Sequence, residues 1–441
     1  MTLSGWVIGA IAAGGVLAAA VLVYICTSPV RSLMAWVATL GIQAEIGSFH
    51  LGLSDVLAIP LAMWGILLMI ERPPALSKLR VTLLAFAGIF LTWAHLTAMF
   101  YRGHLSKWTY VNKDVGLLEM LLCVGAIISI VDSRERLRQA GDALTAGGSI
   151  LNLVGLLLAV ISLRTGFGGF VLYDGLRYVG FMADPNAWAG FLAVIAIFQL
   201  CLLIFDQRGR TALATRIQWT NLGLLVIGVF VSMSRGAMAA LIFGMACTLI
   251  FMTPRRRLTV GSGMALIGAL VSIPLWGSGL ISTVIDRISE PGGVAVRVEI
   301  NRAGWHMYTG SPMSMMTGVG IGTFLDSAPK LGLENQIHNS FLWLLVEGGP
   351  VLLLAFLAIL GIAISHTVKG AKAPEVSVTA IAIFCALASC LVLFNTVEGL
   401  YQRQFWLLVA LPDVFAAIRE RVRVVTLSVR SRPYGTMAVS N

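Results

Sequence analysis

The chain has 441 residues, of which 58% are hydrophobic and 12% are charged, and its formal net charge is +10. Soluble domains average about 25% charged residues and about 45–50% apolar residues, so this composition excludes a soluble globular enzyme, a disordered chain and a disulfide scaffold. It predicts an all-α polytopic integral membrane protein, because continuous apolar segments of about 20 residues cross a bilayer as helices.

About twelve transmembrane helices are expected in chain order. The apolar segments lie near residues 5–26, 52–70, 81–101, 114–131, 144–163, 186–205, 219–232, 235–252, 258–276, 341–365, 377–394 and 404–418. A weaker apolar run at 32–44 is either a half-helix or a thirteenth span. We therefore divide the chain into helices 1–9 at 1–276, a long loop at 277–340, helices 10–12 at 341–424 and a tail at 425–441.

The basic residues predict the orientation. Of the 31 Lys and Arg residues, 19 lie in loops on one side and 12 on the other, and none falls within a predicted span. Because cytoplasmic loops carry the excess of Lys and Arg, both termini are expected inside and the loop 277–340 outside. This bias and contact with membrane lipids explain the net charge, so no nucleic-acid partner is expected. The outer twelve are Arg31, Arg102, Lys107, Lys113, Arg164, Arg177, Arg235, Arg287, Arg297, Arg302, Lys330 and Arg403.

Two outer motifs carry an arginine next to a helix start. Arg177 precedes Asp184-Pro185-Asn186, in which Asp184 or Asn186 can cap the next helix and Pro185 suits its first turn. Arg235 follows Ser234, which can cap the helix that begins there. A guanidinium near the membrane boundary is costly unless it is paired or hydrated, and its planar donors match a phosphate group. Both arginines are therefore candidates for phosphate binding, with an anchor at the lipid interface as the alternative.

The long outer loop holds three more motifs. Arg297-Val298-Glu299-Ile300 comes first, Gly318-Val319-Gly320-Ile321-Gly322-Thr323-Phe324 follows, and His338-Asn339-Ser340-Phe341 runs into an apolar span. The alternate glycines Gly318, Gly320 and Gly322 indicate a tight backbone near a ligand or a helix. The imidazole of His338 can act as a general base near neutral pH, or can simply anchor the helix at the interface. Histidine and cysteine spacing indicates no metal site.

In this order and spacing, the motifs across residues 177–365 resemble those of the O-antigen ligase and O-antigen polymerase superfamily, and most of all an O-antigen ligase of lipopolysaccharide maturation. The resemblance implies a multi-pass glycosyltransferase in the bacterial inner membrane, with its active site facing the periplasm. Such an enzyme moves O-antigen polysaccharide from undecaprenyl diphosphate to a sugar hydroxyl of lipid A–core.

The resemblance also implies roles for residues. Arg235, Arg297 and Arg177 would bind the diphosphate, and His338 would be the base for a direct attack that inverts the anomeric carbon. Asn339, Gly318, Gly320 and Gly322 would support the site, without metal or other cofactor. Carboxylates that could orient His338 or an arginine are Asp326, Glu334, Glu347 and Glu398. Arg102, which has no motif around it, is expected to tolerate substitution better than Arg235 or Arg297.

Three other functions stay open. A polymerase would use the same donor and another repeat unit as acceptor, and a protein O-oligosaccharyltransferase would use a Ser or Thr hydroxyl. A transporter of the lipid-linked glycan is disfavoured, because transporters carry charges and broken helices at mid-membrane, whereas every Lys and Arg here lies outside the predicted spans.

Overall fold

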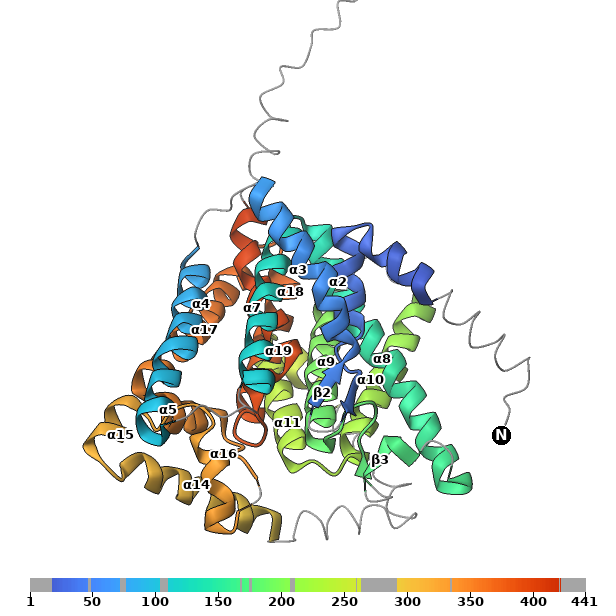
Figure 1. Cartoon of the computed structure of the whole chain (residues 1–441). Coiled ribbons are helices and arrows are strands. Elements are labelled where there is room, and N and C mark those ends of the chain that lie inside the picture. Colours follow the sequence, from blue (N-terminus) through green and yellow to red (C-terminus); the bar gives the residue numbers. More distant parts are fainter. Residues whose placement is uncertain are drawn as a thin grey trace, which may run out of the picture.

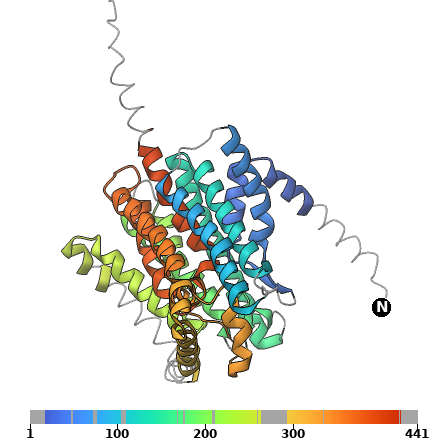
Figure 2. The same ribbon diagram turned by 60° about the vertical axis from the view of Figure 1, so that its left-hand side comes forward.

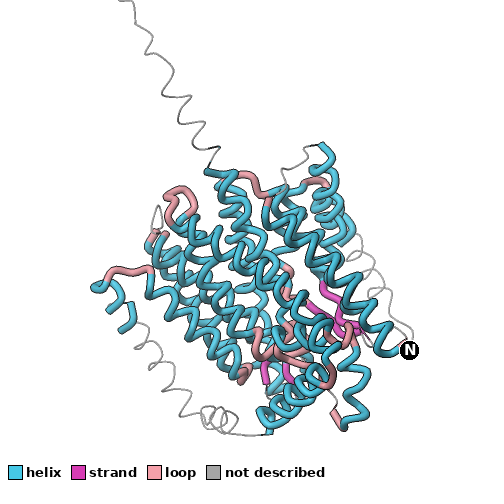
Figure 3. The backbone as a smooth tube through the Cα atoms, turned by 90° about the vertical axis from the view of Figure 1, so that its left-hand side faces the viewer, coloured by secondary structure: helices cyan, strands magenta, loops and turns pink. Residues whose placement is uncertain are grey.

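The structure is a computed structural model that describes residues 18–46, 49–71, 77–103, 110–166, 169–173, 177–206, 211–258, 260–262, 292–333, 335–419 and 421. The described residues form a bundle of helices that run roughly side by side (Figure 1, Figure 2), with two short hairpins (Figure 3). The predicted all-α polytopic class is confirmed. Six helices are long and apolar enough to span a membrane: Leu53–Glu71, Lys78–Arg102, Arg134–Thr165, Pro185–Phe205, Ala212–Val231 and Ser340–Ala371.

The total of about twelve spans stays a prediction. Most of the segment 258–276, the first 17 residues and the tail 425–441 lie outside the described residues, as do residues 277–291 of the long loop. Within the described part, α11 and α18 are apolar helices of 16 and 17 residues, just short of a full crossing.

The elements follow the predicted segments closely. The helices are α2 (Pro29–Ala38), α3 (Leu53–Glu71), α4 (Lys78–Gly88), α5 (Ala94–Arg102), α7 (Gly116–Ile130), α8 (Arg134–Thr165), α9 (Pro185–Phe205), α10 (Ala212–Val231), α11 (Arg235–Ile250), α14 (Gly292–Thr309), α15 (Pro312–Thr317), α16 (Thr323–Ser327), α17 (Ser340–Ala371), α18 (Ser377–Leu393) and α19 (Arg403–Ala410). A π-helical turn, Ile89–Trp93, joins α4 to α5, and a second, Tyr110–Val115, leads into α7. Short 3-10 turns cover Gly169–Val171, Ala328–Leu331, Gly399–Tyr401 and Leu411–Val414.

Helix α9 lies at the centre of the bundle. Its sequence is apolar on every side, as expected for a helix without a face toward water or headgroups, and 89% of its apolar window is buried. It packs against α8, α10, α11 and α18. The helix begins where Asp184 caps it and Pro185 occupies its first turn. A fixed central helix gives the motif at its N-terminus a rigid support.

The run 32–44 is a half-helix and not a thirteenth span. Helix α2 has ten residues, which rise about 15 Å, against about 30 Å of hydrocarbon core. It is followed by the antiparallel hairpin of β1 (Gln43–Ile46) and β2 (Phe49–Gly52). Because the Trp64 indole of α3 donates to the Cys26 carbonyl at 2.9 Å, α2 starts beside the second half of α3 and runs toward the hairpin. Arg31 therefore lies toward the opposite end from the hairpin, which differs from its predicted place in the outer set.

The predicted outer segments gather at one end of the bundle. Helices α14, α15 and α16 lie at the end where β2 and β3 lie, whereas the last described helical residues of the chain lie at the other end (Figure 1). The second hairpin pairs β3 (Leu172–Tyr173) with β4 (Arg177–Tyr178). The first hairpin is linked to the segment that follows the second, because the Gln43 N–H donates to the Phe181 carbonyl at 2.8 Å. We call this end of the bundle the motif end.

Candidate functional site

The first two motifs meet at the side chain of Asn186. Its Oδ1 accepts a hydrogen bond from the Ser234 hydroxyl at 2.9 Å and one from the Arg177 guanidinium at 3.4 Å. Nε of Arg177 also donates to the backbone carbonyl of Ser232 at 3.3 Å. Arg177 is half-buried on β4. These contacts join Arg177 to the turn before α11, although the two motifs are far apart in the sequence.

Helix caps hold both motifs in place. The Asp184 carboxylate accepts from the Asn186 N–H at 2.8 Å and caps α9, and the Ser234 hydroxyl accepts from the first turn of α11. Met233, just before this cap, has φ of +55°, a backbone conformation that is uncommon and strained for a residue with a side chain. The caps expected from the sequence are confirmed, and they make Arg235 the first residue of α11, where it is half-buried.

A short stretch, residues 394–399, connects the Arg235 turn to the His338 motif; we call it the bridging segment. A Cβ atom on Gly236 would lie 2.2 Å from Oγ1 of Thr396, so α11 approaches this segment as closely as its backbone allows. On the other side, the Ser340 N–H donates to the Phe394 carbonyl at 2.8 Å, and the Ser340 hydroxyl accepts from the Gly399 N–H at 2.7 Å. Both motifs are therefore packed against one element.

His338 is half-buried in the chain that leads into α17. The next residue, Asn339, caps α17 by accepting from the N–H groups of Phe341 and Leu342 at 3.1 and 3.0 Å. Burial lowers the pKa of His338 below its ordinary value, and the positive charge of Arg297 lowers it further. An imidazole with a lowered pKa is neutral at pH 7, which is the form that can accept a proton.

Charges from three separate elements act on His338. Asp184, the cap of α9, raises its pKa, whereas Arg297 on α14 and Lys113 before α7 lower it. Helix α14 packs against α15 and α17, which holds Arg297 near the start of α17. The motif end therefore brings the histidine within electrostatic range of the first motif and of the long-loop arginine, as a shared site requires.

The glycine motif has a structural function that its residues explain. Gly318, Gly320 and Gly322 have φ of +75°, +90° and +77°, the left-handed region that favours glycine. A Cβ atom on Gly320 would lie 2.2 Å from the backbone nitrogen of Ala98 in α5, so a side chain has no room there. The tight backbone expected from the alternate glycines is therefore present, and it lies against helices.

Glu347 holds this loop together. Its carboxylate accepts from the Gly322 N–H at 2.9 Å, the Phe324 N–H at 3.0 Å and the Trp343 indole at 2.8 Å. It is 2% exposed. Three donors around one buried carboxylate satisfy a charge that would otherwise be costly to bury. Glu347 thus acts on the glycine loop, and the structure shows no hydrogen bond from it to His338.

Arg102 supports the same loop from outside. Its guanidinium forms an ion pair with Asp326 and donates to the carbonyls of Ile321 and Gly322, each at 3.4 Å. Asp326 is therefore a partner of Arg102. Because Arg102 has these contacts, it is a poor control position for substitutions of the motif arginines. Arg164, exposed in the last turn of α8, is a better one.

Glu398, one of the candidate carboxylates, lies in a cluster near His338 whose other members the sequence did not predict. Lys113 forms an ion pair with Glu398 and lies 4.5 Å from the centre of the Tyr401 ring. Gln336, two residues before His338, donates to the other Glu398 oxygen at 2.6 Å. Lys113 is one of the twelve predicted outer basic residues, and no motif surrounds it. Its only signal in the sequence was its position directly before an apolar span.

Arg403 is likewise buried, at 8% exposure, and forms an ion pair with Asp55. The second Asp55 oxygen accepts from the Gly52 N–H at 2.6 Å, so this pair connects α19 to the first hairpin. Among the four candidate carboxylates, Glu334 lies outside the described residues. Within the described ranges, no group of three His, Cys, Asp or Glu side chains is arranged to hold a metal ion.

Comparison with protein families places the chain beside a known group of membrane proteins. A family model described as O-antigen ligase matches residues 220–357, a range that contains Arg235, Arg297, the glycine motif and His338. Arg177 and Asn186 lie before the matched range, and their contacts with Ser234 connect them to it. No curated protein and no solved structure matches the chain.

Proposed function

We propose that this chain, whose residues 220–357 match a family model described as O-antigen ligase, transfers O-antigen polysaccharide from undecaprenyl diphosphate to a sugar hydroxyl of lipid A–core. The transfer would take place on the periplasmic face of the bacterial inner membrane. The observation that supports this most is the meeting of separate motifs at one end of the bundle, through Asn186 and the bridging segment.

In this proposal the donor diphosphate binds to Arg235, Arg297 and Arg177. The diphosphate is already a good leaving group, so fixed positive charge is more useful than an acid that protonates it. Arginine provides planar, bidentate donors that match phosphate oxygens. The half-buried positions of all three guanidinium-bearing residues would strengthen these interactions relative to open water.

His338 is the proposed general base. Its imidazole takes the proton from the acceptor hydroxyl while that oxygen bonds to the anomeric carbon. The bond from this carbon to the diphosphate breaks, and undecaprenyl diphosphate leaves with the electron pair. Attack from the face opposite the leaving group inverts the anomeric configuration. Positioned general bases contribute about 10²–10⁴-fold to such rates, and the lowered pKa of His338 favours its neutral form.

A gene deletion in the source bacterium tests the acceptor. If the chain is an O-antigen ligase, the core of the deletion strain should lose all attached O-antigen, and polymerised, lipid-linked glycan should accumulate. Core that carries a single repeat unit would instead indicate a polymerase, and loss of glycoproteins with normal lipopolysaccharide would indicate a protein O-oligosaccharyltransferase. Either of these two results contradicts the proposed ligase reaction.

A further inference from the structure

The short helix α15 and the end of α14 expose a group of large apolar side chains. Met313, Met315 and Met316 of α15 are 46%, 41% and 70% exposed, and Trp305 of α14 is 48% exposed. We call these four residues the methionine patch. No Asp, Glu, Lys or Arg occurs from residue 303 to residue 325. Exposed apolar side chains that gather in this way indicate contact with a partner or with a membrane.

Contacts at both ends of α15 fix its depth relative to the candidate membrane spans. At its start, the Ser311 hydroxyl lies 3.4 Å from the Tyr101 hydroxyl, and Tyr101 is the second-last residue of the candidate span Lys78–Arg102. At its end, a Cβ atom on Gly349 of α17 would lie 2.6 Å from the carbonyl carbon of Thr317. Helix α15 is therefore fixed between two membrane spans.

These contacts place α15 at the outer boundary of the hydrocarbon core. Charged side chains lie at that boundary and avoid the core, so Arg102 marks the outer boundary at the end of α5. On α17, Lys369 in the last turn marks the inner boundary. The core is about 30 Å thick, or about 20 helical residues, and that distance before Lys369 leads back to Gly349. Figure 1 shows α15 at the left edge of the bundle, level with α5, where the patch can reach the lipid.

Aromatic side chains surround the patch as they do at a membrane interface. The Tyr308 hydroxyl donates to the Met315 carbonyl at 2.8 Å, which holds α14 against α15. The ring centre of Tyr308 lies 5.6 Å from that of Trp305. Tyr101 contacts the start of α15, and Phe100 beside it is 74% exposed. Trp and Tyr are enriched at the membrane–water interface, because each has an apolar ring and a polar group.

We propose that the methionine patch inserts into the outer leaflet of the membrane, at the boundary between headgroups and acyl chains, and anchors α14 and α15 there. Interfacial helices bury their apolar side about 5–10 Å into this boundary. Methionine suits such contacts, because its unbranched, polarisable side chain adapts to an irregular surface. Lipid is the partner that this position favours, since the two spans that contact α15 are themselves surrounded by lipid.

The anchor fixes the depth of two parts of the motif end. Helix α14 carries Arg297, which is half-buried, and α15 leads directly into the glycine motif at Gly318. A donor embedded in the membrane presents its diphosphate at the membrane surface, so the anchor would hold Arg297 at the depth of the diphosphate. This benefit rests on the proposed function, whereas the insertion itself depends only on the fold.

The test is spin-label EPR of the full chain in nanodiscs of palmitoyl-oleoyl phosphatidylethanolamine and phosphatidylglycerol. Nitroxide labels are attached to Met313→Cys and Met316→Cys in a Cys26→Ser background, since the other five cysteines are buried. The depth of each label follows from its collision rates with oxygen, which concentrates in lipid, and with a nickel chelate, which stays in water. Both labels should be accessible to oxygen and protected from nickel, and melting temperatures should show that the variants fold.

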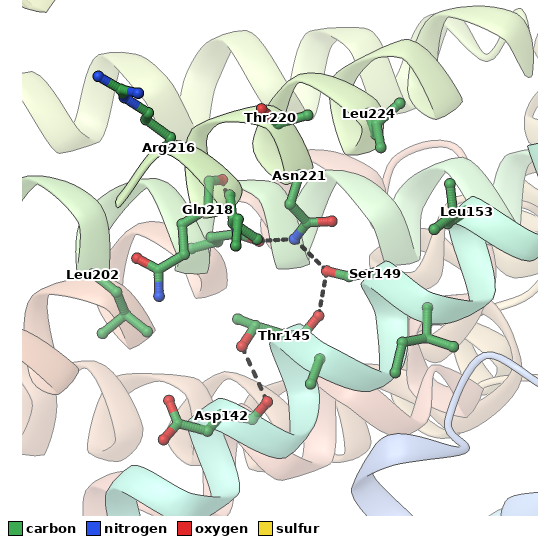
Figure 4. Close-up of a pocket in the computed structure, with 14 residues that line it drawn as sticks. Asp142, Thr145, Ser149, Leu153, Leu202, Arg216, Gln218, Thr220, Asn221 and Leu224 are labelled. Atoms are coloured by element: carbon green, nitrogen blue, oxygen red, sulfur yellow. Dashed lines mark hydrogen bonds between the residues drawn. The ribbon is translucent and has the colours of Figure 1, made fainter. Parts of the chain in front are cut away.

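Two exposed positions provide matched controls. Leu153→Cys lies in the middle of the apolar stretch 143–163 of α8, beside a cavity of about 630 Å³ between α8, α9 and α10 (Figure 4), and reports the hydrocarbon core. Glu299→Cys lies at an exposed, charged position of α14 and reports water. The oxygen-to-nickel ratio of the patch labels should lie well above that of Glu299→Cys and toward that of Leu153→Cys.

Two outcomes would overturn the proposal. A ratio equal to that of Glu299→Cys would show that the patch lies in water. Labels protected from both reagents would show that a second copy of the chain or another protein covers the patch. Because the readout needs no glycan transfer, the insertion and the proposed function succeed or fail separately.

Discussion

The hydrogen bonds of Asn186 give a prediction that depends directly on the geometry. Asn186→Ala removes the acceptor for Ser234 and for Arg177. A neutral hydrogen bond contributes about 1 kcal/mol and a charge-assisted one somewhat more, but the bond to Arg177 is long at 3.4 Å. Loss of both should therefore cost about 2 kcal/mol of transition-state stabilisation, which lowers kcat/KM about 30-fold.

A double-mutant cycle measures whether this cost comes from the coupling itself. The assay is transfer of glycan from purified lipid-linked donor to lipid A–core by the protein in detergent, with Asn186→Ala, Ser234→Ala and the double variant. Because the two side chains share one bond, the loss in the double variant should be smaller than the sum of the two single losses, although Ser234→Ala also removes the cap of α11. Effects that multiply, or no loss in Asn186→Ala, would refute the claim that this contact organises the site.

The remaining predictions concern pH and the glycine loop. A base must be neutral, so activity should fall as the pH drops through the pKa of His338, which lies below its ordinary value. Arg297→Gln removes a charge that lowers the pKa of His338, so it should move the acid limb of the kcat/KM profile to higher pH. Asp184→Asn removes a charge that raises the pKa of His338, so it should move the acid limb to lower pH. Shifts of both variants in the same direction would contradict the assignment of His338 as the base. Gly320→Ala and Gly332→Ala both force a left-handed residue, at about 1–2 kcal/mol each, but only Gly320 would also collide with α5. Melting temperatures should therefore fall clearly more for Gly320→Ala, and equal losses would show that the close approach does not matter.

Composition and continuous apolar segments were enough to predict the class of fold. These features are sufficient because each membrane span must satisfy its own backbone hydrogen bonds in lipid, which makes the formation of a helix a local property of the segment. The helix caps at Asp184 and Ser234 were predictable for the same reason, since a cap depends on residues a few positions apart. The run 32–44 was ambiguous, because its length lies between a full span and a turn, and only packing against α3 decides its direction.

Long-range contacts were not predictable from the sequence. Nothing near Lys113 indicates that Glu398 will neutralise it, because the two residues come from distant segments. Glu347 illustrates the same limit. Its place in an apolar helix indicates that it is functional or paired. The sequence does not indicate that its partners are the backbone N–H groups of the glycine loop. No motif surrounds Arg102, so the sequence predicts that it tolerates substitution. Its contacts with the glycine loop arise only when the chain folds.

The most direct test of the central claim is a single variant of His338 measured for two properties. His338→Ala should lower glycan transfer by about 10²–10⁴-fold, the usual contribution of a general base. Binding of the lipid-linked donor should be unchanged, since the proposed diphosphate ligands are arginines. Transfer at the parental rate in His338→Ala would contradict the account, and a loss of donor binding equal to the loss of transfer would assign the histidine to binding and not to the reaction.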